Sequence, residues 1–181
     1  MNNSGYPTFK LFVPKQAVGA SLVYFDLFNA TGSGVDVLLT SVIPVVSGAV
    51  AVTGVVAVDL YLERTSAIGT AGTAATYNGT DIAVPTFSAM TPGDSPSGSI
   101  TARITPTGGA TVGAIISWCS VFTEETNAGT YIGYLNDLAR RNLPDAPPLV
   151  VIPNTGFRVA QGTVASVGNI GFDVAFQVRK R

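Results

Sequence analysis

The stretch Asn169–Arg179, which reads NIGFDVAFQVR, alternates between apolar residues and residues that are polar or small. Its apolar positions are Ile170, Phe172, Val174, Phe176 and Val178, and between them lie Gly171, Asp173, Ala175, Gln177 and Arg179. Because successive side chains of an extended chain point to opposite faces, this period of two gathers the apolar side chains on one face. The stretch therefore predicts a β-strand that is buried on one side.

Other apolar runs are of two kinds. The same alternation recurs in residues 58–63 and 100–105, which predicts two further half-buried strands. Residues 22–28 and 112–122 are instead apolar on both faces. A strand of this second kind is either central in its sheet or presents one face to another subunit, and the sequence leaves both interpretations open.

Turn signals separate these runs. Glycine occurs 20 times and proline 11 times, often in sequences such as Thr31–Gly34, Asn78-Gly79 and Thr107–Gly109. Short apolar runs between such signals are typical of an all-β fold. We therefore predict an antiparallel β-sandwich of about eight strands with little helix, jelly-roll-like in its connectivity. An immunoglobulin-like sandwich is the alternative, although its Cys…Trp…Cys framework is missing.

The expected organisation is a flexible N-terminal arm, residues 1–8, followed by a single β-sandwich domain, residues 9–181. The first seven residues hold no positive region and no apolar block, so no secretory leader is expected. Helix is expected only in Tyr131–Arg141, for about one or two turns, before Pro144 stops it.

The uncharged stretch Val37–Val58 is long enough to span a bilayer. Pro44 and Gly48 interrupt it, and no cluster of Lys or Arg flanks it. We therefore expect two consecutive buried strands there and no contact with a membrane.

The composition excludes several kinds of chemistry. The 181 residues include no histidine and a single cysteine, which excludes a Ser-His-Asp triad, a His-ligated zinc site and an intrachain disulfide. The 10 Lys and Arg residues balance 11 Asp and Glu residues, which leaves no basic footprint for direct nucleic-acid binding. No local pattern pairs two carboxylates as a glycosidase requires, so we expect no enzymatic activity, no cofactor and no metal.

Charged residues make up only 12% of the chain, against ~25% in ordinary soluble domains. A lone soluble domain presents many charges to water, and large exposed apolar patches mark interaction sites. The sequence therefore predicts that much of the outer surface is buried in a stable assembly, against copies of the same chain and a larger scaffold.

Two stretches carry a resemblance to a known family. The first is Leu60–Thr65 (LYLERT), followed by Gly69–Ala74 (GTAGTA). The second is Pro148–Thr163 (PLVVIPNTGFRVAQGT), which leads into Phe172–Val178 (FDVAFQV). In texture and strand order they resemble the auxiliary head proteins of tailed phages, also called capsid decoration or cement proteins, many of which are jelly-roll trimers.

The resemblance implies a non-enzymatic structural virion protein, made in the host cytoplasm, that binds the capsid exterior as a homotrimer. Its partners are itself and the major capsid protein, whose subunit contacts it stabilises. The family has no catalytic residues to carry over. The candidate contacts with the capsid or a neighbouring copy lie near the chain ends, at Tyr6, Phe9, Lys10, Arg179, Lys180 and Arg181. The basic residues Arg179–Arg181 are alternatively a solvated tail.

The alternative function is a carbohydrate-binding, receptor-binding head of a fibre or lectin-like protein, since jelly rolls also host lectins. Such a site needs an exposed aromatic platform with polar neighbours. The candidate platform residues are Tyr77, Asn78, Asp81, Tyr131 and Tyr134.

Overall fold

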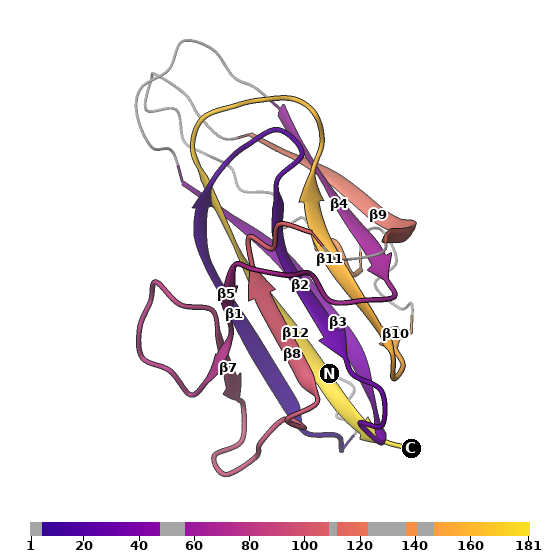
Figure 1. The fold of residues 1–181 in the computed structure, drawn as a ribbon. Helices are drawn as coiled ribbons and strands as arrows, with labels where there is room; N and C mark the ends of the chain where they lie inside the picture. Colours follow the sequence, from indigo (N-terminus) through magenta and orange to yellow (C-terminus); the bar gives the residue numbers. More distant parts are fainter. Residues whose placement is uncertain (1–4, 48–56, 109–111, 123–136, 141–146) are drawn as a thin grey trace.

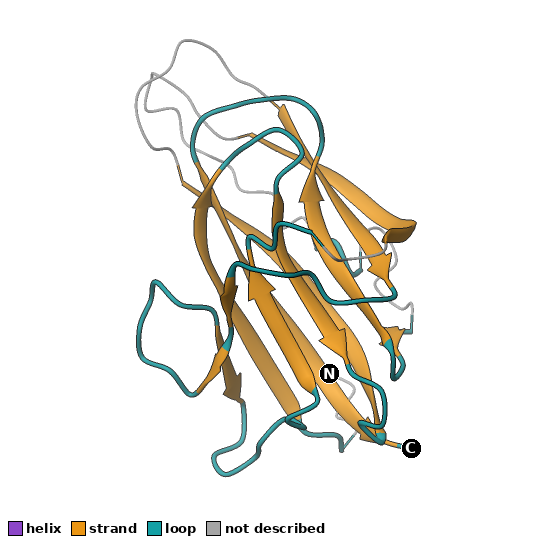
Figure 2. Ribbon diagram, viewed as in Figure 1, coloured by secondary structure: helices purple, strands orange, loops and turns teal. Residues whose placement is uncertain are grey.

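The computed structural model describes residues 5–47, 57–108, 112–122, 137–140 and 147–181. Within these residues the chain consists of β-strands joined by loops and turns, without a helix (Figure 2). The short helix expected in Tyr131–Arg141 lies outside the described residues except for 137–140, which form a turn.

Twelve strands are described, of which β5, β6, β7 and β10 are no longer than four residues. The eight longer strands agree with the number expected. The strands are β1 (Thr8–Ala17), β2 (Val23–Asn29), β3 (Val35–Ser47), β4 (Ala57–Thr65), β5 (Thr73–Ala74), β6 (Thr76–Tyr77), β7 (Thr86–Ala89), β8 (Ile100–Ile104), β9 (Val112–Phe122), β10 (Leu149–Val151), β11 (Thr155–Gln161) and β12 (Asn169–Lys180).

The strands form two sheets that pack face to face (Figure 1). Sheet A has the order β10-β3-β12-β1-β7-β6, and sheet B has the order β5-β8-β2-β11-β4-β9. Every described pairing except that of β6 with β7 is antiparallel, so the prediction of an antiparallel β-sandwich is confirmed. The chain passes from one sheet to the other between β1, β2, β3 and β4, and again between β9, β10, β11 and β12. This connectivity is compatible with a jelly roll.

The predicted alternation in β12 places the core of sheet A. Ile170, Phe172, Val174 and Phe176 are each no more than 1% exposed, and they point toward sheet B. β12 pairs with β1 on one side and with β3 on the other, so its backbone is hydrogen-bonded along both edges. The alternation of the sequence gathers the apolar side chains of β12 on one face, and that face is buried against sheet B.

A β-bulge in β2 orients two aromatic side chains of sheet B toward sheet A. Phe25 pairs with Val159 and Val23 pairs with Ala160, so Tyr24 is an extra residue in the ladder. The bulge turns Tyr24 inward beside Phe25, and both rings reach Phe172 of the opposite sheet, at centroid distances of 5.4 and 5.2 Å. This aromatic cluster fixes how the sheets lie on one another.

The uncharged stretch contains most of β3, in sheet A, and the first two residues of β4, in sheet B. Residues 48–56, where most of the second expected strand falls, lie outside the described residues. Pro44 lies opposite Phe172 of β12, beyond the three residues of β3 that pair with β10. Proline lacks an amide hydrogen. It is tolerated at this position because no second described strand pairs with β3 there and needs that donor. In the described part of the chain, no helix has the length and hydropathy that crossing a bilayer requires.

A buried amide ties the loop after β11 to β2. The Tyr24 hydroxyl donates a 2.6 Å hydrogen bond to Gln161 Oε1, and the Gly19 amide donates to the same oxygen at 3.1 Å. Gln161 Nε2 in turn donates to the Val164 carbonyl at 2.7 Å. Burial raises the pKa of the Tyr24 phenol well above its usual range, so the hydroxyl keeps its proton and remains a donor.

Replacing Tyr24 by phenylalanine removes this donor but keeps the ring against Phe172. We expect Tyr24→Phe to lower the free energy of unfolding by about 1 kcal/mol, because Gln161 Oε1 loses a hydrogen bond in a dry site. Denaturant unfolding followed by circular dichroism measures the change. Tyr61→Phe, at a half-buried tyrosine of β4, is the matched control, with an expected change within about 0.5 kcal/mol. Equal losses in the two variants would contradict the role given to the Tyr24 hydroxyl.

Candidate interaction surfaces

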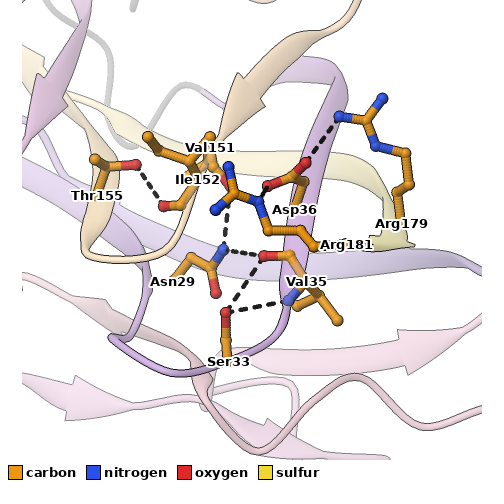
Figure 3. A network of polar contacts seen from close by, with 9 residues as sticks. All are labelled: Asn29, Ser33, Val35, Asp36, Val151, Ile152, Thr155, Arg179 and Arg181. Carbon is orange, nitrogen blue, oxygen red and sulfur yellow. Dashed lines mark hydrogen bonds and ion pairs between the residues drawn. The ribbon is translucent and has the colours of Figure 1, made fainter.

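Asp36 anchors the C-terminal end of the chain. Its carboxylate is only 5% exposed, and two guanidinium groups flank it (Figure 3). Arg179 Nη2 donates to Oδ2 at 2.8 Å, and Arg181 Nε lies 2.8 Å from Oδ1 in an ion pair that lacks hydrogen-bond alignment. The hydrogen bond to the Asp36 carboxylate raises the pKa of Arg179 above its usual range. Both arginine charges are therefore used within the chain.

Asn29 joins three strands at the same end of the sandwich. Its side chain is fully buried, and Nδ2 donates to the carbonyls of Val35 at 2.9 Å and Val151 at 3.1 Å (Figure 3). These carbonyls belong to β3 and β10, whereas Asn29 ends β2. The hydrogen bonds of Asn29 thus hold together the ends of β2, β3 and β10 beside Asp36.

The basic residues at the C-terminus are part of sheet A. Arg179 and Lys180 belong to β12, opposite Asp36 and Val35, so this segment is strand rather than tail at those positions. Among the described residues, Lys180 makes no ion pair, and its side chain is exposed. Lys180 is therefore the member of the basic cluster whose charge is directed to solvent.

The N-terminal segment meets the C-terminal strand at this end (Figure 1). Met1–Ser4 lie outside the described residues, whereas Pro7 accepts a 3.0 Å hydrogen bond from the Val178 amide. Tyr6 is 39% exposed and lines an open groove of about 550 Å³ together with Arg179 and Lys180. With Phe9, which also lines this groove, the structure brings together four of the six contact residues named from the sequence.

Phe9 and Lys10 lie on opposite faces of β1. Phe9 is 1% exposed and stacks on Phe176 at a centroid distance of 5.6 Å, so it is a core residue. Phe9 therefore offers little surface to a partner, because the alternation of β1 turns its side chain inward. Lys10 points outward, and its ammonium lies 2.5 Å from a carboxylate oxygen of Asp173.

A row of charges crosses the outer face of sheet B. Arg103, Asp26, Arg158 and Glu63 stand at neighbouring positions on β8, β2, β11 and β4. Arg158 Nε lies 2.6 Å from Glu63 Oε2, and both side chains are mostly buried. Opposite charges on adjacent strands stabilise the pairing of those strands.

Asp26 is the buried member of this row. It is 1% exposed, and its Oδ2 accepts a 2.5 Å hydrogen bond from the Gly69 amide in the loop after β4. Burial raises the pKa of the Asp26 carboxyl, while hydrogen bonds from the backbone of Gly69 and Arg103 and the charge of Arg103 act in the opposite direction. The carboxyl therefore holds the loop onto sheet B at an electrostatic cost.

The far end of sheet B is apolar instead of charged. Ile115, Trp118 and Phe122 of β9 are 57%, 50% and 52% exposed, and they point away from the core; we call them the β9 stripe. Cys119 and Val121, between them, face inward and are buried. Among the described strands, β9 forms one edge of sheet B, and β5 forms the other (Figure 1). An exposed apolar stripe on an outer strand marks an interaction surface.

A second apolar surface lies on the outer face of sheet A. It consists of Phe12, Val45 and Ile82, which we call the sheet A patch, and these side chains are 45%, 43% and 83% exposed. They border a shallow hollow of about 810 Å³ whose rim carries Lys10 and Lys15. The outer faces of a sandwich point in opposite directions, so the two apolar surfaces can contact two different partners at once.

Three of the residues proposed as a glycan platform, Tyr77, Asn78 and Asp81, are described by the structure. The Tyr77 hydroxyl donates to the Asp94 carbonyl, and Asp81 accepts a 2.8 Å hydrogen bond from the Ala83 amide. Asn78 has a φ of 51°, which is a turn conformation. Tyr131 and Tyr134 lie outside the described residues.

No group of three or more acidic or cysteine side chains gathers closely enough to hold a metal ion within the part of the chain that the structure describes. Sequence reasoning missed Asp36, because its two arginine partners are more than 140 positions away along the chain. The sequence also did not show which of the two runs with apolar residues on both faces, 22–28 or 112–122, has an exposed face. In the structure it is 112–122, where Trp118 and Phe122 are exposed.

Comparison with known proteins adds no relative. No protein-family model matches the sequence, and no match was found among curated proteins or among solved structures. The function is therefore argued from the fold and the surfaces described above.

The buried carboxyl gives Asp26→Asn a definite pH signature. Below about pH 4, the ordinary pKa of aspartate, the carboxyl is neutral in both the folded and the unfolded chain. As the pH rises through the raised folded-state pKa of Asp26, the unfolded chain ionises first, so the folded wild-type protein loses stability relative to the variant. We therefore expect the difference in free energy of unfolding to move in favour of Asp26→Asn as the pH increases from about 4 toward neutrality.

Urea unfolding of wild type and variant at half-unit pH steps measures this difference. The matched control is Asp81→Asn, at an exposed turn carboxyl, for which we expect a much flatter difference. A flat difference for Asp26→Asn, or one that favours the wild type as the pH rises, would show that burial does not dominate at this carboxyl.

Proposed function

We propose that this chain is a non-enzymatic structural protein of a virion, a decoration or cement protein that binds the outside of a phage capsid as a homotrimer. In this role it stabilises contacts between subunits of the major capsid protein. Its location would be the capsid exterior, after synthesis in the host cytoplasm. Two things support the proposal: the resemblance of the sequence to capsid decoration proteins, and the exposed apolar side chains of the two sheets.

One observation carries the proposal: apolar side chains are exposed on the outer faces of both sheets. The β9 stripe lies on sheet B and the sheet A patch on the opposite side of the sandwich. A protein that strengthens a shell needs two such surfaces, one for its own copies and one for the shell. A typical stable interface buries about 1,200–2,000 Å² in total, and many repeats on a shell multiply a modest affinity.

The use of charge supports the same function. The ion pairs of the described residues join strands of one chain: Lys10 with Asp173, Glu63 with Arg158, and Asp36 with Arg179 and Arg181. With charged residues forming only 12% of the chain, few remain to keep an isolated particle hydrated. The surface is therefore better suited to permanent contact than to free diffusion.

The alternative, a carbohydrate-binding head, has less support. A glycan platform needs an exposed aromatic face beside free polar groups, and the Tyr77 hydroxyl and the Asp81 carboxylate are already engaged with backbone atoms. We therefore propose the structural role, and a glycan array with clear hits would favour the alternative instead.

The test compares virus particles produced with and without this protein. Electron microscopy should show copies of the β-sandwich on the outer surface of complete particles. Particles that lack the protein should release their DNA at a lower temperature, and adding back purified protein should restore the original temperature. The proposal is wrong if complete particles carry no copy on their exterior and the release temperature is the same in both preparations.

A further inference from the structure

The β9 stripe has a geometry suited to contact with another protein. Ile115 lies opposite Glu63, Trp118 opposite Tyr61, and Phe122 opposite Ala57 of β4, with a local irregularity between the first two pairs. All three stripe residues face outward, and each is at least half exposed. They form a line along β9, an edge strand among the described strands of sheet B, on the side away from the core.

The stripe carries no charge of its own. Residues 112–122 (VGAIISWCSVF) contain no ionisable side chain other than a buried cysteine, and no proline. The two described carboxylates of β4, the strand that pairs with β9, are already occupied: Glu63 is paired with Arg158, and Asp59 accepts a 2.5 Å hydrogen bond from the Ser120 hydroxyl. Natural edge strands that must avoid contact carry lysine or proline, and β9 has neither.

This lack of charge favours a second copy as the partner. Where equivalent stripes gather around a rotation axis, each residue of a stripe lies near its own copies, so a charge on the stripe would lie near like charges. The sheet A patch would suffer this repulsion, because Lys10 and Lys15 stand on its rim. The interface cores of homo-oligomers are depleted in charge and enriched in aromatic residues, which describes the β9 stripe and not the sheet A patch.

The available area fits the centre of such an interface. A large aromatic side chain carries about 150–250 Å² of surface, so the half-exposed Trp118 and Phe122 each contribute about 100 Å². With Ile115, the stripe offers roughly 300 Å², against about 800 Å² per partner in a standard interface. The stripe therefore supplies the apolar core of a contact whose rim comes from neighbouring residues, and tryptophan is a residue type that dominates such cores.

We propose that the β9 stripe is the surface through which copies of this chain associate, with each stripe facing the same stripe of another copy around the symmetry axis of the homo-oligomer. Trp118 lies at the centre of this contact. The inference rests on the homo-oligomer of the proposed function and names the surface that forms it. The sheet A patch then remains available on the opposite side.

The chain carries its own reporter for this contact, because Trp118 is its only tryptophan. We would compare wild type with Ile115→Lys, which keeps the tryptophan and places a charge beside it, by sedimentation velocity and tryptophan emission over a concentration series. The matched control is Ile82→Lys, which places the same charge in the sheet A patch. Circular dichroism and the unfolding midpoint establish that each variant is folded.

We expect wild type and Ile82→Lys to sediment as oligomers with blue-shifted emission that moves to longer wavelength on dilution. Ile115→Lys should sediment as a monomer, with association weakened at least tenfold and with the long-wavelength emission of a hydrated indole. If Ile115→Lys does not fold, the milder Ile115→Ser variant and the coupling between wild-type emission and oligomer fraction provide the same test.

Two results would overturn the inference. One is a wild-type oligomer that Ile115→Lys leaves intact, and the other is a tryptophan whose emission does not change while the oligomer dissociates. Both leave the homo-oligomer of the proposed function standing. A wild-type protein that is monomeric at all concentrations overturns the inference as well, and binding of that monomer to virus particles, measured separately by co-sedimentation, then decides the structural role.

Discussion

The packing of Phe172 against Tyr24 and Phe25 holds the two sheets of this protein together. Its ring lies 5.4 and 5.2 Å from theirs, and the bulge at Tyr24 is what allows two consecutive residues of β2 to reach it. Phe172 lies in β12, which pairs on both sides, so the rest of sheet A is positioned relative to this contact. The inner faces are thereby filled, and any further apolar side chain must lie on an outer face.

The alternating strands were predictable because their signal is local. In β12 the period of two identifies the buried face from the sequence alone, and the same holds for Leu60 and Leu62 of β4, which are fully buried. The runs with two apolar faces are different. β2 is central, and the loop that contains Gly69 covers its outer side at Asp26. β9 is outermost among the described strands, and its outer side is exposed. The two runs look alike in sequence because what covers each of them is far away along the chain or belongs to another molecule.

The ion pairs of the C-terminal residues also could not be predicted from the sequence, because their partners are distant along the chain. Arg179 and Arg181 look like free cations in sequence, and the carboxylate that binds them is on β3, at Asp36. Phe9 was named as a candidate contact residue, but the pairing of β1 with β12 and β7 places its side chain in the core. Sequence reasoning predicted the β-sandwich, and Tyr6 and Lys180, two of the candidate contact residues that it named, are exposed in the structure. It could not identify ion pairs whose members come together only when the sheet forms.

The distribution of charge explains why an apolar outer strand can be tolerated. Ion pairs fix β1 to β12, β4 to β11 and β3 to the C-terminal residues, and each uses a charge that could otherwise guard an exposed surface. An unguarded apolar strand in a free monomer invites open-ended aggregation. A contact between equivalent stripes around a rotation axis closes on itself, because the stripes of the copies cover one another and none remains for a further molecule. The association proposed for β9 would thus remove the aggregation hazard that the low charge content creates, and it would link the stability of the folded chain to the stability of its assembly.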